Sequence, residues 1–337
     1  MKERIETRTG GRGVRLDTHL LDLLACPECG SEELFLLSED ALTCTSCGAH
    51  YRIRNGIPRM LPARLAAALA RKEDYPEMPG PAAHQKKDTV DESDPEADRF
   101  MWEHKLYDWG KEVIYRDAKA AAIFESYAEK GARDLCHFIE HWADGVEGKN
   151  LLYVGSGNDR MVSVPLEVKG SFLVNLDVAT APLQDLTEAG VRNCVCGDAR
   201  RLPFRSGVFD VVFSKGSVHH SHPIDEPLLS MARVTRPGGH IIVAEPNKYA
   251  VFALRLPSFL LPSGLGQPSP YERALSAREV KRVLARDDIS QFEVTALTHA
   301  PAGMPLLITR MWERLGKAMP WLMDRFAFEF ILCGQKA

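Results

Sequence analysis

The chain has 337 residues, of which 45% are hydrophobic and 26% are charged, and its formal net charge is −4. These proportions are typical of a globular protein with a core, so they exclude a chain that is disordered throughout. The excess of acidic residues argues against a nucleic-acid-binding protein whose main task is to grip phosphates. At about 150 residues per domain, the length favours two domains.

Three features favour the cytoplasm as the location of the protein. Residues 1–15 are polar and arginine-rich, which predicts a flexible arm and no secretory signal. No apolar stretch reaches the roughly 18 residues that a membrane span needs. Four of the eight cysteines are clustered, and in a reducing compartment such a cluster is expected to bind metal in preference to forming disulfides.

Two Cys-x-x-Cys pairs lie within the compact segment 16–62. The first pair is Cys26 and Cys29, and the second, after fourteen intervening residues, is Cys44 and Cys47. Four thiolates at this spacing suit a tetrahedral Zn²⁺, and four protein ligands leave no open position for catalysis. The sequence therefore predicts a small zinc ribbon with a structural ion that supplies much of its folding energy.

The residues around these cysteines resemble a known family. The segments LLDLLACPECGSEELFL and LTCTSCGAHYRIRNGIPRMLP resemble the zinc-ribbon domain found in activator subunits of tRNA and protein methyltransferases. The same domain is found fused to the N-terminus of some methyltransferases. The resemblance implies a binding and scaffolding module without chemistry of its own.

Behind the ribbon, the composition changes twice. Residues 63–99 are mostly acidic and Pro-rich, with few large apolar side chains, which is typical of a linker. Folding of this segment over a ligand is the alternative. Residues 100–337 form the second predicted domain, which opens with one or two helices between residues 117 and 143, where apolar positions recur at helical spacing.

Short apolar runs alternate with helical stretches from residue 149 onward. The predicted strands lie at 151–154, 171–176, 191–196, 209–213, 240–244 and 292–297, with a last strand in AFEFILCG near the end of the chain. Apolar strands separated by helices are typical of a parallel sheet with helices on both faces. We therefore expect an α/β fold with a doubly wound, mostly parallel, Rossmann-like sheet of seven strands.

Glycines follow the first strand of this sheet, and acids end or follow the next two. Gly155 and Gly157 allow the backbone to approach a ligand closely and to turn into a helix whose N-terminal amides face the site. Asp177 ends the second strand, where a carboxylate can accept two ribose hydroxyls. Asp198 and Ala199 follow the third strand. A single Gly-x-Gly is a weak signal, but this combination predicts a nucleotide-type ligand.

Residues 149–246 resemble, in order and spacing, the class I S-adenosylmethionine (SAM) methyltransferases, in particular the small-molecule branch called type 11. The motifs that carry the resemblance are VGSGN, LVNLDVA, GDARRLPF, FDVVF, SVHH and RVTRPGG. The resemblance implies that SAM is the cofactor and that residues 100–337 form the catalytic domain.

The same resemblance implies where SAM binds. The two glycines of the loop would line its methionine and ribose part, and Asp177 would hold the ribose hydroxyls. Asp198, with Ala199 beside it, would face the adenine amino group. The full set of implied cofactor-binding residues is Gly155, Ser156, Gly157, Asp159, Asp177, Val178, Asp198, Ala199 and Ser214.

Two positions depart from the pattern of that family. Tyr153 stands where the family has an acid two residues before the first glycine, and Asp159 replaces the third glycine. The missing acid helps to place the methionine end of SAM. Either Asp159, near a helix N-terminus, substitutes for it electrostatically, or the two changes weaken or alter the use of the cofactor.

Three histidines follow the fourth strand, at the edge of the sheet where ligands bind in such folds. They are His219, His220 and His222, in SVHHSHP. One of them is a candidate base or substrate-orienting residue, and the alternative is a histidine that only packs and hydrogen-bonds. Glu245, at the end of the fifth strand, is a second candidate, with a helix or loop cap as its alternative role.

Helical elements beyond a minimal core are expected near 100–143, 247–275 and 303–326, and the resemblance implies that such insertions form a substrate lid. Their apolar character suggests a hydrophobic small molecule, a sugar or a lipid-linked acceptor. The sequence leaves open a contact with a membrane surface and the formation of a homodimer.

We therefore expect an enzyme with structural zinc that transfers the methyl group of SAM to a small molecule by in-line displacement. One alternative is an RNA base methyltransferase. Two observations argue against it. Acidic residues outnumber basic ones, and the Asn-Pro-Pro-Tyr-like element expected after the fourth strand is replaced by Ser214-Lys215-Gly216-Ser217. The other alternative is a non-catalytic methyltransferase-like scaffold, which Tyr153 and Asp159 keep open.

Overall fold

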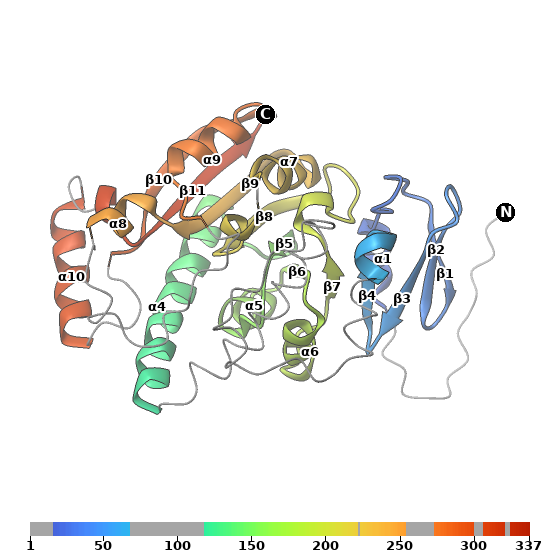
Figure 1. The fold of residues 1–337 in the computed structure, drawn as a ribbon, viewed down its shortest axis with the longest axis horizontal. Helices are drawn as coiled ribbons and strands as arrows, with labels where there is room; N and C mark the ends of the chain where they lie inside the picture. The colour runs from blue at the N-terminus through green and yellow to red at the C-terminus, as the bar shows by residue number, and fades with distance from the viewer. Residues whose placement is uncertain (1–15, 68–117, 222, 254–272, 300–305, 321–323) are drawn as a thin grey trace, which may run out of the picture.

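The computed structural model describes residues 16–67, 118–221, 223–253, 273–299, 306–320 and 324–337 (Figure 1). Its sheet has eleven strands in the order β1-β2-β3-β4-β7-β6-β5-β8-β9-β11-β10. The predicted arm 1–15, most of the predicted linker 63–99 and parts of the three predicted lid elements lie outside the described residues.

The N-terminal unit consists of one helix and four short strands. The elements are α1 (Thr18–Leu23), β1 (Leu34–Ser38), β2 (Ala41–Cys44), β3 (His50–Arg54) and β4 (Ile57–Met60). Helix α1 begins after Asp17, whose side chain accepts a hydrogen bond from the His19 amide. Burial alternates along β3, so that Tyr51 and Ile53 face the core while their neighbours face solvent.

Strand β4 joins this unit to the larger sheet. It pairs in antiparallel fashion with β3 on one side and in parallel with β7 (Cys194–Gly197) on the other. Arg59 lies opposite Cys196, and Met60 lies opposite Gly197. The domain boundaries at 62 and 100 stay predictions, but the hydrogen bonds of a single sheet continue from the ribbon into the second unit (Figure 1).

All seven strands predicted for the second unit are present. They are β5 (Asn150–Val154), β6 (Phe172–Asp177), β7, β8 (Phe209–Lys215), β9 (Thr235–Pro246), β10 (Ile289–Thr298) and β11 (Glu329–Lys336). The first five are mutually parallel, and β11 runs antiparallel between β9 and β10. The predicted α/β fold with a mostly parallel sheet is therefore confirmed.

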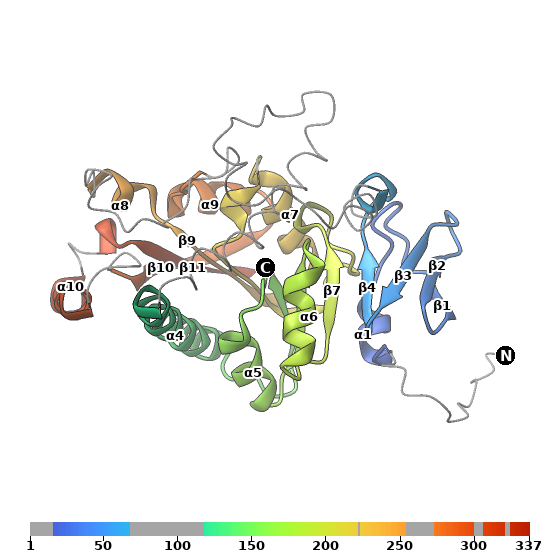
Figure 2. The ribbon, with the colours of Figure 1, turned by 60° about the horizontal axis from the view of Figure 1, so that its bottom comes forward.

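Helices cover both faces of this sheet (Figure 2). They are α4 (Ala118–Trp142), α5 (Arg160–Val168), α6 (Thr180–Glu188), α7 (Asp225–Val234) and α9 (Ala277–Leu284). Successive side chains of β5 point to opposite faces. Leu151 and Tyr153 pack with α4 and α5, whereas Leu152 and Val154 belong to the core that includes α7 and α9. Burial on both faces explains why these strands are apolar throughout.

The carboxyl ends of the parallel strands lie at one edge of the sheet, where several short elements follow them. These are η2 (Ala199–Arg201), η3 (Val218–His220), α8 (Lys248–Ala253), α10 (Leu306–Ala318) and η5 (Asp324–Phe326). Over the residues that the structure describes, none of the helices has the length and apolar character needed to cross a membrane.

Candidate functional site

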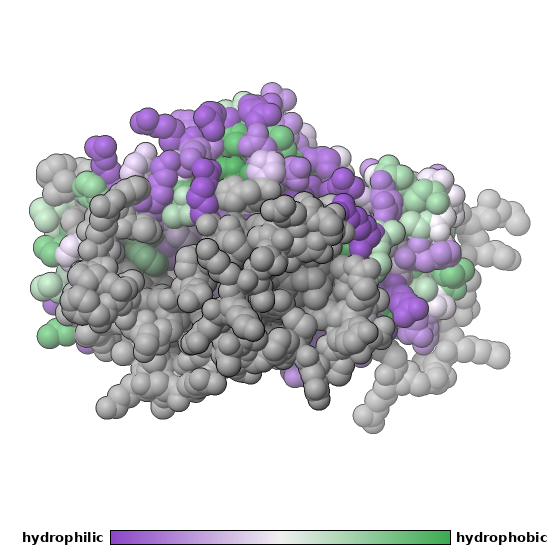
Figure 3. All heavy atoms as spheres, in the orientation of Figure 1, coloured by the Kyte–Doolittle hydropathy of each residue, from purple (hydrophilic) through white to green (hydrophobic). Residues whose placement is uncertain are grey.

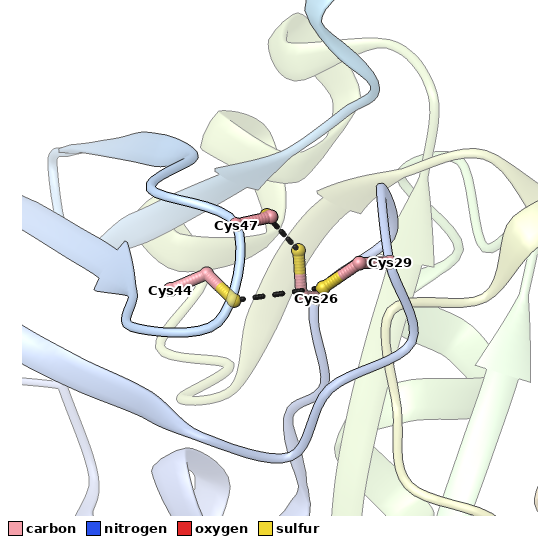
Figure 4. A group of neighbouring side chains, drawn as sticks. All are labelled: Cys26, Cys29, Cys44 and Cys47. Carbon is pink, nitrogen blue, oxygen red and sulfur yellow. Dashed lines mark hydrogen bonds between the residues drawn. The ribbon is translucent and has the colours of Figure 1, made fainter.

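The four cysteines of the ribbon converge on one point (Figure 4). The Sγ atoms of Cys26 and Cys47 are 3.7 Å apart, as are those of Cys29 and Cys44, and all four sulfurs lie within 4.8 Å of one another. A tetrahedral Zn²⁺ at about 2.3 Å from each sulfur requires sulfur–sulfur edges of about 3.8 Å. The donor set therefore fits a structural zinc ion.

The two knuckles that hold these cysteines have the same backbone geometry. Gly30 and Gly48 both have a φ of +75°, and their amides donate to the carbonyls of Cys26 and Cys44. A residue with a side chain rarely adopts this φ, so glycine is needed at both turns.

Polar groups around the cysteines shift the pKa values of the individual thiols in different directions. The Tyr51 hydroxyl lies 2.9 Å from the Sγ atom of Cys26 and is buried with it. Burial raises the pKa of Cys44, but backbone N–H groups of Cys47 and Ser46 lower it by more, to about 7. A backbone hydrogen bond lowers the pKa of Cys47, but burial and the neighbouring cysteines raise it by more, to about 12. A metal ligand must be deprotonated, so of these two thiols Cys44 is the one that its surroundings prepare for Zn²⁺.

The loop after β5 is in close contact with the loop after β8. Gly155 has a φ of +66°, and a Cβ placed on it would lie 2.2 Å from the Cβ of Ser217. Glycine is therefore required here for two reasons, the backbone angle and the space. Gly157 has a φ of +52°, but a Cβ there would meet nothing within 4 Å, so this glycine faces open space.

Asp177 ties the loop after β5 to the loop after β6. Its Oδ2 atom accepts the Gly157 amide at 2.8 Å, and its Oδ1 atom accepts the Ala179 amide at 2.8 Å. Burial raises the pKa of this carboxyl group, and the amides of Ala179, Gly157 and Val178 offset part of the rise. The residue that the sequence assigns to the ribose thus also shapes the glycine loop.

Asp198 has a partner that sequence reasoning missed. It caps η2 by accepting the Arg200 amide at 2.9 Å, and both of its carboxylate oxygens also accept from the Arg200 guanidinium group. The side chain is 9% exposed, so the pair is largely buried. A carboxylate has about four acceptor positions, so Arg200 constrains how many remain for a ligand.

Tyr153 and Asp159, the two departures from the family pattern, contact each other. The Tyr153 hydroxyl donates to the Oδ2 atom of Asp159 at 3.1 Å, and Nζ of Lys215 lies 3.3 Å from the same oxygen. Asp159 precedes α5 but makes no side-chain capping bond. Burial first, and the charge of Asp159 second, raise the pKa of Tyr153, which stays a neutral donor. The carboxylate is therefore held in place by one phenol and one ammonium group.

An open cavity of about 850 Å³ begins beside this carboxylate. Four of its lining residues are acidic and two are basic, so its walls favour a cationic ligand. The lining residues are Glu125, Ala128, Asn158, Asp159, Arg160, Met161, Asp185, Glu188, Ala189 and Lys215.

The candidate base His219 is held by Glu245. Nδ1 of His219 lies 2.6 Å from Oε2 of a Glu245 side chain that has no exposed surface. The other oxygen, Oε1, accepts the amides of Val218 at 2.8 Å and Ser217 at 3.2 Å. Glu245 therefore caps η3, which is the alternative role that the sequence offered, and it also orients a histidine; its role as a base or substrate-orienting residue stays a prediction. With Nδ1 donating, the basic nitrogen of the neutral imidazole is Nε2.

The other predicted site residues occupy the same edge of the sheet, apart from His222, which lies outside the described residues. The ring of His220 lies 4.1 Å from that of His219, centre to centre. Ser156 is buried in the glycine loop, while Val178 and Ala199 follow β6 and β7. The Ser214 hydroxyl is buried and lies 2.8 Å from that of Ser217, a residue of the SVHH motif to which the sequence assigned no role.

Comparisons with known families agree with this geometry. The family described as "Methyltransferase domain" matches residues 152–243, and the family described as "Trm112p-like protein" matches residues 17–56. The chain therefore carries a methyltransferase domain behind a Trm112p-like zinc ribbon, and the predicted resemblance to both is confirmed.

Curated relatives match part of the chain. A demethylmenaquinone methyltransferase from Beutenbergia cavernae is 36% identical over 111 residues, which are 31% of this chain and 45% of that protein. The biotin biosynthesis bifunctional protein BioHC from Cellvibrio japonicus is 26% identical over 136 residues, which are 40% of this chain and 27% of that protein. The chain thus spans less than half the length of these relatives.

Two solved structures match this chain with TM-scores below 0.5. Magnesium protoporphyrin IX methyltransferase from Synechocystis PCC 6803 has a TM-score of 0.49 and 12% identity, covering 70% of this chain and 99% of that one. A chain from the complex of the Haloferax volcanii Trm112 methyltransferase activator with a methyltransferase has a TM-score of 0.42 and 18% identity, covering 63% and 95%.

Proposed function

Given a methyltransferase domain behind a zinc ribbon, we propose that this protein transfers the methyl group of SAM to a small hydrophobic molecule in the cytoplasm. The observation that carries the proposal is the hydrogen bond between the Gly157 amide and Asp177. It holds a glycine that faces open space next to a half-buried carboxylate, at the carboxyl ends of adjacent parallel strands. Nucleoside ligands bind at this position in open α/β sheets.

The chemistry of the surrounding residues suits SAM. Asp177 is the acceptor for the ribose hydroxyls, and Asp198, restrained by Arg200, is the acceptor for the adenine amino group. Asp159 replaces the acid that is missing at Tyr153, because it presents a carboxylate to the acid-rich cavity. The methionine part of SAM carries an ammonium group, a sulfonium group and one carboxylate, so it is cationic on balance and is attracted by such walls.

Bound SAM supplies an electrophilic methyl group on a positively charged sulfur. The protein must align the acceptor with that bond, exclude water and remove a proton from the acceptor where the reaction requires it. In this proposal Nε2 of His219 takes that proton while Nδ1 donates to Glu245. The buried Glu245 carboxylate then stabilises the imidazolium that forms.

The acceptor is proposed to be hydrophobic for two reasons. The relatives that match with 34–49% identity are named demethylmenaquinone methyltransferases, so a quinol ring is the first acceptor to test. The elements that follow β9 and β10 at the same edge also expose apolar side chains, among them Tyr249 of α8 and Leu307 of α10.

Calorimetry with SAM tests the cofactor site. We expect the wild-type chain to bind SAM and the Asp177→Ala variant to lose measurable binding. Asp22→Ala, which removes an exposed acid of α1, should bind as the wild type does. If folded, zinc-loaded wild-type protein releases no heat with SAM, the scaffold alternative replaces the proposal.

Transfer of labelled methyl groups from SAM to a short-chain demethylmenaquinol tests the acceptor. We expect label in the quinol fraction with the wild type and none with Asp177→Ala. SAM binding without transfer to the quinol would refute this acceptor class and leave the cofactor site standing. Label in added RNA at physiological salt would favour the RNA methyltransferase.

A further inference from the structure

Helix α10 presents an apolar stripe to solvent. Leu307, Met311 and Leu315 are 81%, 53% and 38% exposed, and they follow one another at intervals of four residues. Side chains at this spacing lie on one face of a helix. Figure 3 shows hydrophobic side chains at the edge of the molecule where α10 lies.

Basic side chains border this stripe. Arg310, Arg314 and Lys317 are all exposed, and helical spacing places them along the strip next to the apolar one. The only acid within the sequence of α10 is Glu313, which is 8% exposed. The outward face of α10 is therefore apolar and positively charged at once.

Buried polar contacts fix which face of α10 points outward. The Oε1 atom of Glu313 accepts the His299 amide at 2.8 Å, and its Oε2 atom lies 3.3 Å from Nζ of Lys130 on α4. A Cβ on Gly316 would lie 2.4 Å from the His299 ring, so the helix is packed closely on that side. The stripe is thus on the side of the helix opposite these contacts.

Helix α10 lies at the same edge of the sheet as the cofactor site. Strand β10 runs parallel to β9, because both pair in antiparallel fashion with β11, and α10 follows the carboxyl end of β10. On α4, the residue after Lys130 is Gly131, and a Cβ there would lie 3.9 Å from Nζ of Lys215, a residue that lines the cavity.

We propose that α10 binds the surface of an anionic lipid bilayer, lying in the plane of the membrane with its apolar stripe among the acyl chains. A helix with exposed leucines on one strip and arginines on the next has the composition of interfacial membrane helices. The basic residues pair with anionic headgroups. A membrane is favoured over a protein partner, because most protein surfaces have no continuous layer of negative charge above an apolar phase. Membrane binding goes beyond the proposed methyl transfer and does not depend on it.

Such binding would bring the carboxyl edge of the sheet to the membrane. A hydrophobic acceptor dissolved in the bilayer would then reach the site without crossing water. The charge requirement is specific, because uncharged lipid would engage only the apolar stripe.

Sedimentation with lipid vesicles tests the proposal on the full chain. The vesicles contain either phosphatidylcholine alone or phosphatidylcholine with about one third phosphatidylglycerol. We expect binding to the anionic vesicles, at least tenfold weaker for Leu307→Ser/Met311→Ser. For Arg310→Gln/Arg314→Gln we expect about fivefold weaker binding per arginine removed, and loss of this difference at high salt.

A matched control removes apolar surface elsewhere. Phe35 and Leu37 on β1 are 55% and 62% exposed, and Phe35→Ser/Leu37→Ser should bind vesicles as the wild type does. Thermal unfolding checks that all variants are folded.

Three outcomes would refute the proposal. In the first, the wild type does not sediment with anionic vesicles at all, and in the second, Leu307→Ser/Met311→Ser binds them as tightly as the wild type. In the third outcome, Phe35→Ser/Leu37→Ser loses as much vesicle binding as the α10 variants do. If instead the α10 variants convert a dimer into a monomer in analytical ultracentrifugation, the stripe binds a second copy of the chain. Because binding is measured without SAM or acceptor, failure here is distinguishable from failure of the proposed function.

Discussion

Nδ1 of His219 lies 2.6 Å from Oε2 of Glu245, whose side chain is completely buried. The same carboxylate accepts two backbone amides, so a single buried acid sets both the path of the loop after β8 and the orientation of the imidazole. The proposed role of His219 in proton transfer rests on this arrangement.

Replacing His219 by alanine should lower kcat by about 10²–10⁴-fold if the histidine removes a proton from the acceptor. The affinity for SAM should stay nearly the same, because no cofactor contact is assigned to the imidazole. Calorimetry and rate measurements on His219→Ala separate the two effects. The exposed His141→Ala serves as the control, and an undiminished rate in His219→Ala would mean that alignment of the acceptor suffices.

Gly155→Ala should destabilise the protein more than Gly157→Ala. Both substitutions place a side chain at positive φ, at a cost of about 1 kcal/mol, but only Gly155→Ala also collides with Ser217, which adds about 1–3 kcal/mol. Denaturant unfolding measures both. In Gly155→Ala/Ser217→Gly the collision is removed, so part of the stability should return. If the double variant is no more stable than Gly155→Ala, the contact with Ser217 does not cause the loss of stability.

Gly157→Ala should affect SAM binding more than stability. Its Cβ would enter the open space beside Asp177, so we expect a loss of SAM binding, with a loss of stability limited to the cost of the positive φ. Calorimetry and denaturant unfolding on the same sample decide the matter, and unchanged SAM affinity would place the cofactor elsewhere.

Removal of zinc should weaken the large sheet as well as the ribbon. We expect about one zinc per chain in the wild type and none in Cys26→Ser/Cys44→Ser. Without the ion the ribbon loses much of its folding energy, and β4 then no longer protects the β7 amides. Hydrogen exchange should therefore accelerate at β7 and less at β8. Cys333→Ser, which alters a buried cysteine outside the cluster, should keep its zinc.

Stability should depend on pH through His299. Burial lowers the pKa of His299, but hydrogen bonds to Glu313 and Asp324 raise it by more, above its ordinary value of 6.5. The folded state thus binds this proton more tightly than the unfolded state. The resulting stabilisation is fully present below the unfolded pKa and is lost as the pH rises through the folded pKa.

His299→Gln isolates this effect. The difference in unfolding free energy between wild type and His299→Gln should be larger near about pH 5.5 than near about pH 8.5, because only the protonated imidazole attracts both carboxylates. Denaturant titrations at both values measure it. An equal difference at the two pH values would show that the histidine acts by packing alone.

The sequence predicted well the features that depend on local patterns. The strands from β5 to β9 are apolar because each is buried on both faces, and the zinc ligands are recognisable because the two knuckles repeat the same turn. The positions of the glycine loop and of Asp177 follow from the strand ends.

Contacts between distant segments left no signal in the sequence. Pairing of β4 with β7 joins residues that are more than a hundred positions apart, and backbone hydrogen bonds place few demands on side chains. The same holds for Ser217 above Gly155. For Asp198, the partner Arg200 is only two residues away, but an arginine near an acid is too common to identify a pair. Which of the three histidines meets Glu245 depends on the 3-10 turn of η3.

Because the ribbon and the large sheet belong to one chain, the pairing of β4 with β7 does not depend on the concentration of the protein. Two separate proteins joined by one short strand would come apart as their concentration falls, whereas a tether keeps the local concentration of the ribbon near the millimolar range. Strand β4 therefore stays paired with the edge of β7 even at low concentrations of the protein. We therefore expect metal supply, and not the encounter of two subunits, to decide how much of the protein is assembled.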